Sequence, residues 1–162
     1  QAEKLYSVMM EMCGLEGSET VLDLYTGAGP IALLISRRAG CVIGIESVES
    51  AVADAKRNAA LNGIDNVEFV HGEVEKLLGG IINDTKPQAV IVDPPRVGLH
   101  KNAIASIIEA SPDKLVYVSC NPSTLARDAG LLVESGYRLE AVRPVDMFPH
   151  TYHIECVARF VK

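Results

Sequence analysis

Apolar positions along the chain follow two spacings, and their alternation predicts strands and helices in turn. Short continuous apolar runs rich in β-branched residues are typical of buried strands, and they occupy 20–25, 41–45, 67–71, 89–92 and 115–119. Elsewhere apolar residues recur every three or four positions, which predicts helices over 2–13, 30–38, 48–61, 73–78, 101–110 and about 122–135. Two closing strands are expected at 137–143 and 152–161.

The order of these elements predicts the fold class. Strands that alternate with helices form a mostly parallel sheet covered by helices on both faces. The closing strands lack a helix between them, which predicts an antiparallel C-terminal strand at one side of the sheet. We therefore expect a doubly wound, Rossmann-like α/β fold with 1–162 as one domain. The segment 79–87 is expected to be a loop because it begins with two glycines.

Composition narrows the class of protein. With 48% hydrophobic and 22% charged residues in 162, the chain is globular. It has no apolar run that could span a bilayer and no signal peptide at its start. The four cysteines show no paired spacing, which argues against a metal site in this segment and favours a reducing cytoplasm; they are Cys13, Cys41, Cys120 and Cys156.

Charge bears on possible partners. The formal net charge of −6 counts against unaided binding of nucleic acid, since phosphate contacts need basic side chains. The chain also starts inside an apparent helix. We therefore expect a domain of a longer protein, in which an N-terminal part outside this segment would supply the basic surface.

One cysteine occupies a position suited to chemistry. Cys120 directly follows the strand at 115–119, and Asn121 and Pro122 are typical of a helix N-cap and first turn. The residue thus lies at the carboxyl edge of the sheet, where ligands of open α/β folds bind. The positive end of a helix dipole favours a reactive thiolate. The alternative is that Cys120 is a small buried apolar residue.

A glycine loop follows the first strand and predicts an adenosine-containing cofactor. Gly27 and Gly29 let the backbone approach a ligand closely. Glu46 ends the next strand and is placed to bind both ribose hydroxyls. The same spacing, with Ala32 as third small residue, also satisfies the nicotinamide fingerprint. Asp23, a polar residue within the strand before the loop, favours S-adenosylmethionine instead.

Two further motifs place charged groups near the same edge. Asp93 and Arg96 flank two prolines that stiffen the backbone after the fourth strand; a proline-rich turn with a surface salt bridge is the alternative. Glu155 is a carboxylate in a mostly apolar last strand. It is either paired for structure or retained as a general base. Cys156 is expected on the opposite face, in packing.

A histidine pair near the last strand has a weaker interpretation. His150 and His153, with Cys156 three residues on, resemble a metal set. Three ligands strung along the entrance to a strand would need a bend to converge on one ion. We therefore predict no metal in this segment and assign His150 to a rigid loop that shapes the pocket.

Four motifs together resemble one family over nearly the whole chain. They are, in order, D-L-Y-T-G-A-G, I-V-D-P-P-R-x-G, Y-V-S-C-N-P-x-T-L-A-R-D and D-M-F-P-H-T-x-H-x-E. This set resembles the RNA uracil-5 methyltransferases, which make 5-methyluridine in transfer or ribosomal RNA. The resemblance implies an S-adenosylmethionine-dependent enzyme with RNA as its substrate, and an RNA-binding domain upstream of this segment.

The resemblance also implies roles for individual residues. It makes Cys120 the nucleophile and Glu155 the base that removes the ring proton. Predicted cofactor contacts are Tyr25, Gly27, Gly29, Glu46 and Asp93, and predicted substrate contacts are Arg96, Asn121 and His150. Pro30 and Glu73 depart from family positions where some members have asparagine.

Three other functions are compatible with parts of the pattern. An amino-methyltransferase acting on adenine or guanine would share the fold and use Asp93 and the prolines after it, but it needs no cysteine. A nicotinamide-dependent enzyme would use the same glycine loop. A non-catalytic cofactor-binding module would serve a partner protein.

Overall fold

A computed structural model describes residues 1–147, 150–151 and 154–162. Its helices are α1 (Ala2–Cys13), α2 (Pro30–Ile35), η1 (Ser36–Arg38, a 3-10 turn), α3 (Glu49–Leu61), α4 (Val74–Thr85), α5 (Lys101–Ala110) and α6 (Pro122–Glu134). Its strands are β1 (Thr20–Leu24), β2 (Cys41–Glu46), β3 (Val67–His71), β4 (Ala89–Val92), β5 (Lys114–Ser119), β6 (Arg138–Val145) and β7 (Glu155–Val161). The expected alternation of strands and helices is confirmed.

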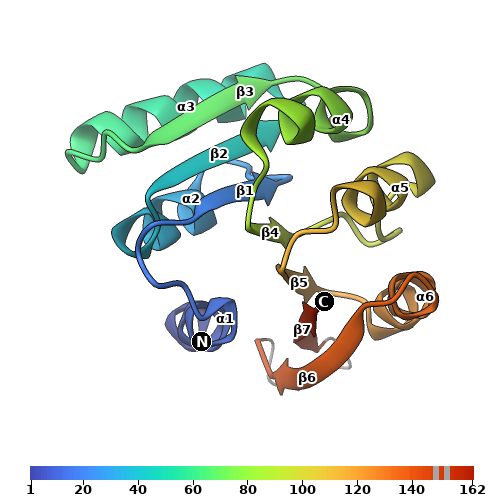
Figure 1. Ribbon diagram of the computed structural model, residues 1–162. Helices are drawn as coiled ribbons and strands as arrows, with labels where there is room; N and C mark the ends of the chain where they lie inside the picture. The colour runs from blue at the N-terminus through green and yellow to red at the C-terminus, as the bar shows by residue number, and fades with distance from the viewer. Residues whose placement is uncertain (148–149, 152–153) are drawn as a thin grey trace.

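The strands of the described residues form one sheet in the order β3-β2-β1-β4-β5-β7-β6 (Figure 1). Strands β1 to β5 pair in parallel, and β7 is antiparallel to both β5 and β6. The chain winds outward from β1 to β3 and then restarts on the other side of β1 at β4. The point between β1 and β4 is a topological switch point, where doubly wound folds bind ligands.

Helices cover the sheet on both faces and enclose two apolar cores. One core lies between the sheet and helices α4, α5 and α6, with Leu78, Ile107 and Leu132 fully buried. The other lies under α1, α2 and α3, where Met9 and Ile35 are fully buried. Figure 1 shows the separation of the two helix layers. Alternate residues of each strand supply alternate cores, as the period of a strand requires.

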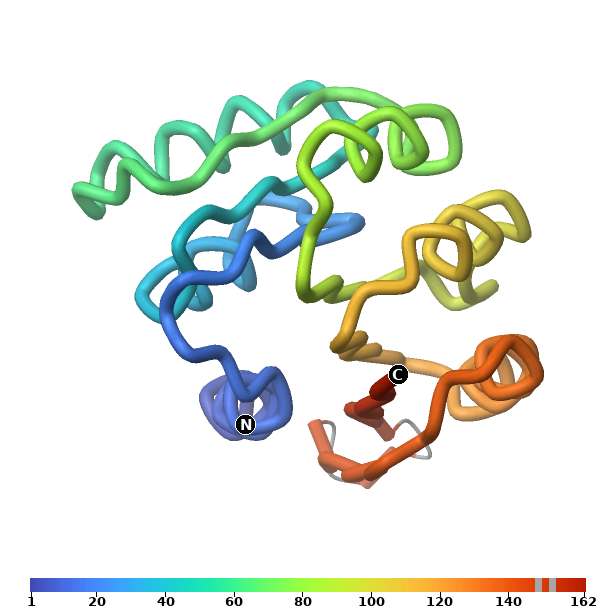
Figure 2. The backbone as a smooth tube through the Cα atoms, viewed as in Figure 1, coloured from blue at the N-terminus to red at the C-terminus, as the bar shows by residue number. Residues whose placement is uncertain are grey.

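Helix α1 packs beside the end of the chain. In the backbone tube of Figure 2, the N-terminal helix, in blue, lies close to the last strands, in red. The Arg159 guanidinium on β7 donates a 2.9 Å hydrogen bond from Nη1 to the Met12 carbonyl. Glu11 of α1 forms a two-pronged ion pair with Arg143 of β6, at 2.6 and 2.8 Å. The first helix is therefore fastened to the last two strands.

The loop prediction for 79–87 is wrong for most of that segment. Helix α4 continues through Gly79 and Gly80 and ends at Thr85, where Lys86 takes a left-handed φ of 46°. Val74, Leu78 and Ile82 recur at four-residue spacing and are all buried. Burial of this stripe against the core outweighs the low helix propensity of two glycines.

The last two strands begin later than the sequence predicts. Strand β6 covers Arg138–Val145, and it includes Pro144 because an edge strand tolerates a missing N–H group. Strand β7 begins at Glu155 instead of 152. Of the extra positions, Ile154 lies outside any strand, and residues 152–153 lie outside the described part of the chain. Within the described residues, no helix has the length and apolar character to cross a bilayer.

Candidate active site at the carboxyl edge of the sheet

The glycine loop after β1 makes a tight turn toward the end of β2. Tyr25, Gly27 and Gly29 all have positive φ, at 65°, 56° and 85°. A Cβ added at Gly27 would meet no atom within 4 Å, so this part of the loop faces open space where a ligand can approach. At Gly29 a Cβ would lie 2.8 Å from the Phe69 ring, so that glycine instead permits close packing.

Glu46 links the glycine loop to the next helix. Its Oε2 accepts a 3.0 Å hydrogen bond from the Gly27 backbone N–H, and its Oε1 accepts one of 2.9 Å from the Val48 N–H. These contacts fix the carboxylate at the carboxyl end of β2. Each oxygen has further lone pairs, so the carboxylate can also accept hydrogen bonds from a ribose diol.

Two more carboxylates share this edge. Asp23 is fully buried, and its Oδ2 accepts a 2.5 Å hydrogen bond from Thr26 Oγ1, while Oδ1 has no partner among the described residues. Burial raises the pKa of Asp23 to about 7, and Asp93 and Glu46 add to that rise. Desolvation, followed by the charge of Glu155, raises the pKa of Asp93 to about 6.

The carboxylates near the glycine loop bear on the choice between two candidate cofactors. Burial first, and neighbouring carboxylates second, raise the pKa values of Asp23 and Asp93, so a nearby cation would stabilise their ionised forms and an anion would destabilise them. The methionine part of S-adenosylmethionine carries a sulfonium and an ammonium group, whereas a nicotinamide dinucleotide would bring an anionic pyrophosphate. The residues present therefore fit the cationic S-adenosylmethionine better than a nicotinamide dinucleotide.

Two tyrosines border the site. The Tyr25 side chain leaves the glycine loop toward α4, where its hydroxyl donates a 3.3 Å hydrogen bond to Glu75. The predicted contact of Tyr25 with the cofactor would therefore be made by its backbone in the turn, and the side chain would take no part. Tyr6 of α1 was not predicted from the sequence. Burial, followed by the charges of Asp93 and Asp23, raises the pKa of its phenol.

Cys120 and Glu155 lie at the neighbouring ends of β5 and β7. Ser119 pairs with Cys156 across these antiparallel strands, and this is the last pair of the ladder. Cys120 follows Ser119 in the bend after β5, and Glu155 precedes Cys156 as the first residue of β7. Both residues are half-buried.

Alternation along β7 assigns Glu155 to one face of the sheet. Val157, two residues from Glu155, belongs to the core under α1. Cys156 is 7% exposed and belongs to the opposite core, under α4 to α6, as expected for a packing residue. Glu155 thus faces the α1 side of the sheet, and its charge also acts on Asp93.

The predicted substrate contacts surround this edge. Asn121 is the N-cap of α6, its side chain accepting from the Ser123 N–H and donating from Nδ2 to the Arg96 carbonyl at 3.1 Å. Arg96 is exposed in the turn after β4. His150 is exposed between β6 and β7 with a φ of 73°.

The suggested metal set cannot be assembled from the part of the chain that is described. No group of three potential metal ligands gathers among those residues. Cys156 is buried in the core, and His153 lies outside the described residues.

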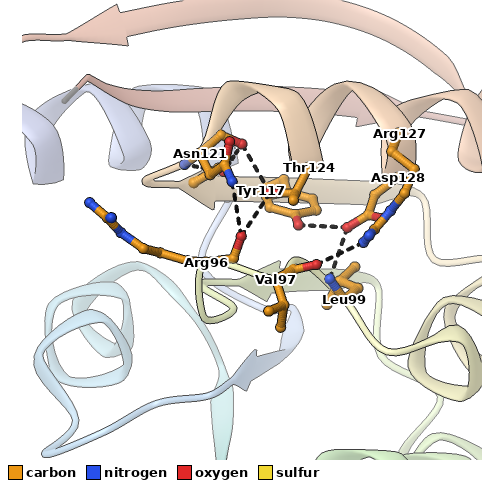
Figure 3. A network of polar contacts seen from close by, with 9 residues as sticks. Arg96, Val97, Leu99, Tyr117, Asn121, Thr124, Arg127 and Asp128 are labelled. Atoms are coloured by element: carbon orange, nitrogen blue, oxygen red, sulfur yellow. Dashed lines mark hydrogen bonds and ion pairs between the residues drawn. The ribbon is translucent and has the colours of Figure 1, made fainter. Parts of the chain in front are cut away.

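Sequence reasoning assigned no role to the end of the third motif. The structure shows Arg127 and Asp128 of α6 in a polar network with Tyr117 of β5 and the turn after β4 (Figure 3). The residues were visible as part of the motif L-A-R-D, but a helix pattern does not reveal which loop a helix contacts.

Comparison with known proteins decides the family. The family model described as tRNA (uracil-5-)-methyltransferase matches residues 2–162. The chain belongs to this family. Curated members include an uncharacterized RNA methyltransferase of Caldanaerobacter subterraneus, 50% identical over 98% of this chain, and one of Bacillus cereus, 48% identical over 97%. The chain covers only 35% and 34% of those two proteins, about a third of their length.

Solved structures agree with this family assignment. The tRNA (uracil-54, C5)-methyltransferase of Pyrococcus abyssi, solved with S-adenosyl-L-homocysteine, is 38% identical with a TM-score of 0.86; the match covers 99% of this chain and 38% of that one. The precorrin-6y C5,15-methyltransferase of Geobacter metallireducens has a TM-score of 0.80 at 16% identity, with 98% of this chain and 88% of that one covered. The second likeness shows the fold alone. The predicted fold class and family are confirmed.

Proposed function

We propose that this chain is the catalytic part of an enzyme that methylates carbon 5 of a uridine in RNA, through a covalent bond between Cys120 and the uracil ring. The observation that supports this proposal most is the register of β5 and β7, because the neighbouring strand ends that it pairs adjoin Cys120 and carry Glu155. Family membership supports the same reaction class. An amino-methyltransferase would need neither of these two residues.

Cys120 supplies the nucleophile in this proposal. Carbon 5 of uracil reacts poorly with a methyl sulfonium. Addition of the Cys120 thiolate to carbon 6 forms a sulfur–carbon bond and moves an electron pair onto carbon 5, which can then accept a methyl group. A covalent intermediate of this kind replaces one difficult step by easier ones.

Glu155 completes the reaction as general base. After methylation, carbon 5 still carries its original hydrogen. The Glu155 carboxylate takes that proton, the electron pair of the carbon–hydrogen bond restores the ring double bond, and the bond to Cys120 breaks to release the thiolate. Two reactive groups at neighbouring strand ends suit this order of steps, because they would act on adjacent ring atoms.

The remaining edge residues bind and orient the methyl donor. S-adenosylmethionine, when bound, supplies an electrophilic methyl group and leaves as S-adenosylhomocysteine. The Gly27 turn gives its nucleoside room, Glu46 binds the ribose, and Asp23 and Asp93 attract the cationic end. The target uridine must leave its stack to reach Cys120, as bases do for other enzymes that modify them.

Replacement of the nucleophile tests the proposal directly. In the complete protein that carries this chain, Cys120→Ala should reduce formation of 5-methyluridine below detection, because no bond to carbon 6 can form. Binding of S-adenosylhomocysteine, measured by calorimetry, should stay within about threefold of wild type. The control Cys41→Ala, at an exposed cysteine of β2, should leave both unchanged. Methylation by Cys120→Ala at the wild-type rate would refute the covalent route.

Replacement of the base should trap the intermediate. With Glu155→Gln, Cys120 still adds to uracil and the methyl group still transfers, but the proton stays on carbon 5. A methylated RNA–protein adduct should then persist in a denaturing gel and disappear in the double variant with Cys120→Ala. Normal turnover without an adduct would remove Glu155 from the mechanism. An RNA digest with label in methyladenosine instead of methyluridine would favour the amino-methyltransferase.

A further inference from the structure

The turn that follows β4 is fastened to helix α6 through its backbone. The Arg96 carbonyl accepts hydrogen bonds from Asn121 Nδ2 at 3.1 Å and Thr124 Oγ1 at 3.3 Å. The next carbonyl, of Val97, accepts one of 3.0 Å from Arg127 Nη2. In Figure 3 these carbonyls are turned toward α6, while the Arg96 side chain extends away from the network.

Asp128 is the buried centre of this attachment. It is 0% exposed, and Oδ2 accepts hydrogen bonds of 2.8 Å from the Tyr117 hydroxyl and 2.8 Å from the Leu99 N–H. Oδ1 accepts from Arg127 Nε at 2.8 Å and Nη2 at 2.7 Å. Burial of a carboxylate is costly unless donors surround it. These donors hold the end of the turn, at Leu99, against both α6 and β5.

The turn passes close to side chains of α6 at Gly98. Gly98 has a φ of 81°, and a Cβ there would lie 2.5 Å from Arg127 Nη2 and 2.7 Å from Asp128 Oδ2. Only glycine fits such a position without displacing the network. We call this set the α6 clamp: Asn121, Thr124, Arg127, Asp128 and Tyr117.

The clamp joins the two halves of the candidate site. The turn begins at Asp93, in the predicted cofactor site, where its N–H is bonded to the Leu24 carbonyl of β1 at 3.3 Å. Helix α6 begins two residues after Cys120. Any movement of the turn relative to α6 would therefore change the separation between a methyl donor bound at Asp93 and the thiol of Cys120.

We propose that Arg127, through the α6 clamp, is a positioning residue that sets this separation for methyl transfer. The inference rests on the proposed function. Reacting groups must be held near 3 to 3.5 Å, and a displacement of about 1 Å can cost roughly 100-fold in rate. Arg127 is 53% exposed as a side chain, but its partner Asp128 is fully buried, so loss of the pair also lowers folding stability and kcat must be compared per folded molecule. Its contacts to Val97 and Asp128 act on the geometry of the turn.

The test compares Arg127→Met with a matched arginine in the complete protein. Arg57→Met removes another exposed arginine, whose ion pair with Asp54 at 2.8 Å lies on α3, away from the clamp. For Arg127→Met, kcat per folded molecule for uridine methylation should fall at least tenfold, with the Kd for S-adenosylhomocysteine within threefold of wild type. Arg127→Lys should recover part of kcat, since one ammonium reaches one of the two acceptors. Arg57→Met should match wild type in both measurements.

A second variant and a measurement without substrate separate the outcomes. Thr124→Val, which keeps the side-chain shape and removes the bond to Arg96, should lower kcat in the same direction. Hydrogen exchange at the Leu99 amide should be at least tenfold faster in Arg127→Met than in Arg57→Met. In one outcome the wild type methylates uridine, while Arg127→Met is equally active per folded molecule or shows unchanged exchange at Leu99. Either result refutes the positioning role and leaves the proposed function standing. A wild type that fails to methylate uridine refutes the proposed function, and this inference falls with it.

Discussion

At the residue scale, the candidate site depends on charges that are unfavourable until a ligand arrives. Asp23 and Asp93 have raised pKa values because burial and neighbouring carboxylates oppose their ionisation. The motif spacing predicts that Asp93, Cys120 and Glu155 belong to one site, since strand ends share an edge, and this stays a prediction. It could not predict Tyr6 or Asp128, because their roles depend on which helix packs beside which turn.

The raised pKa of Asp93 gives a prediction about stability and pH. Its folded-state pKa is about 6, above the ordinary value of 3.8, so the folded protein binds more protons than the unfolded chain between these values. Stability contributed by this group therefore falls as pH rises through that window. Asp93→Asn removes the charge and should raise Tm relative to wild type at pH 8, with a smaller difference at pH 5.

Thermal unfolding of the complete protein at the two pH values measures this effect. Asp93 keeps part of its surface in solvent, which screens the interaction, so the direction is the prediction. Asp65→Asn, at an exposed aspartate beyond α3, is the control and should show no such pH-dependent difference. The same Asp93→Asn variant should bind S-adenosylhomocysteine more weakly. A Tm difference that is larger at pH 5 than at pH 8 would contradict the assigned cause.

At the element scale, burial decides where local propensity misleads. The apolar periods predicted α1, α3, α5 and all seven strands close to their observed positions. They predicted only the first part of α4, because Gly79 and Gly80 suggested a loop. A short stretch of sequence reveals the low helix propensity of glycine. It does not reveal the core against which Val74, Leu78 and Ile82 pack.

A glycine replacement in α4 tests this explanation. Gly80 is exposed, and a Cβ added there would meet no atom within 4 Å. Gly80→Ala should therefore stabilise the protein by about 0.5–1 kcal/mol through higher helix propensity. Urea denaturation of the complete protein measures the change. Gly44→Ala in β2 should destabilise it, because its Cβ would lie 2.7 Å from the Phe69 ring. Destabilisation by Gly80→Ala would show that α4 is not helical at this point.

At the scale of the whole molecule, one sheet separates two cores and joins them into a cooperative unit. The sequence predicted helices on both faces but not the strand order, since nothing local specifies that β7 inserts between β5 and β6. Helix α1 closes the core on the side of the candidate site and is tied to the last two strands. Loss of packing under α1 should therefore lower the free energy of unfolding of the entire fold.

Two adjacent methionines of α1 allow a matched test. Met9 is 0% exposed in the core, whereas Met10 is half-buried. Met9→Ala should destabilise by about 2–5 kcal/mol because it leaves a cavity. Met10→Ala should cost clearly less. Chemical denaturation can be monitored through hydrogen exchange of core amides on both faces of the sheet. These amides should show one shared transition for this part of the protein. Separate transitions for the two faces, or equal costs for the two variants, would contradict this account.

The switch point between β1 and β4 separates the proposed nucleoside contacts from the proposed reactive groups, both along the chain and across the sheet. Every proposed nucleoside contact precedes residue 47, and both proposed reactive groups follow residue 119. A recombined gene could thus inherit its donor pocket from one ancestor and its target chemistry from another, with a single crossover near β4. Chimeras joined at that seam offer a way to retarget methylation while leaving the nucleoside pocket untouched.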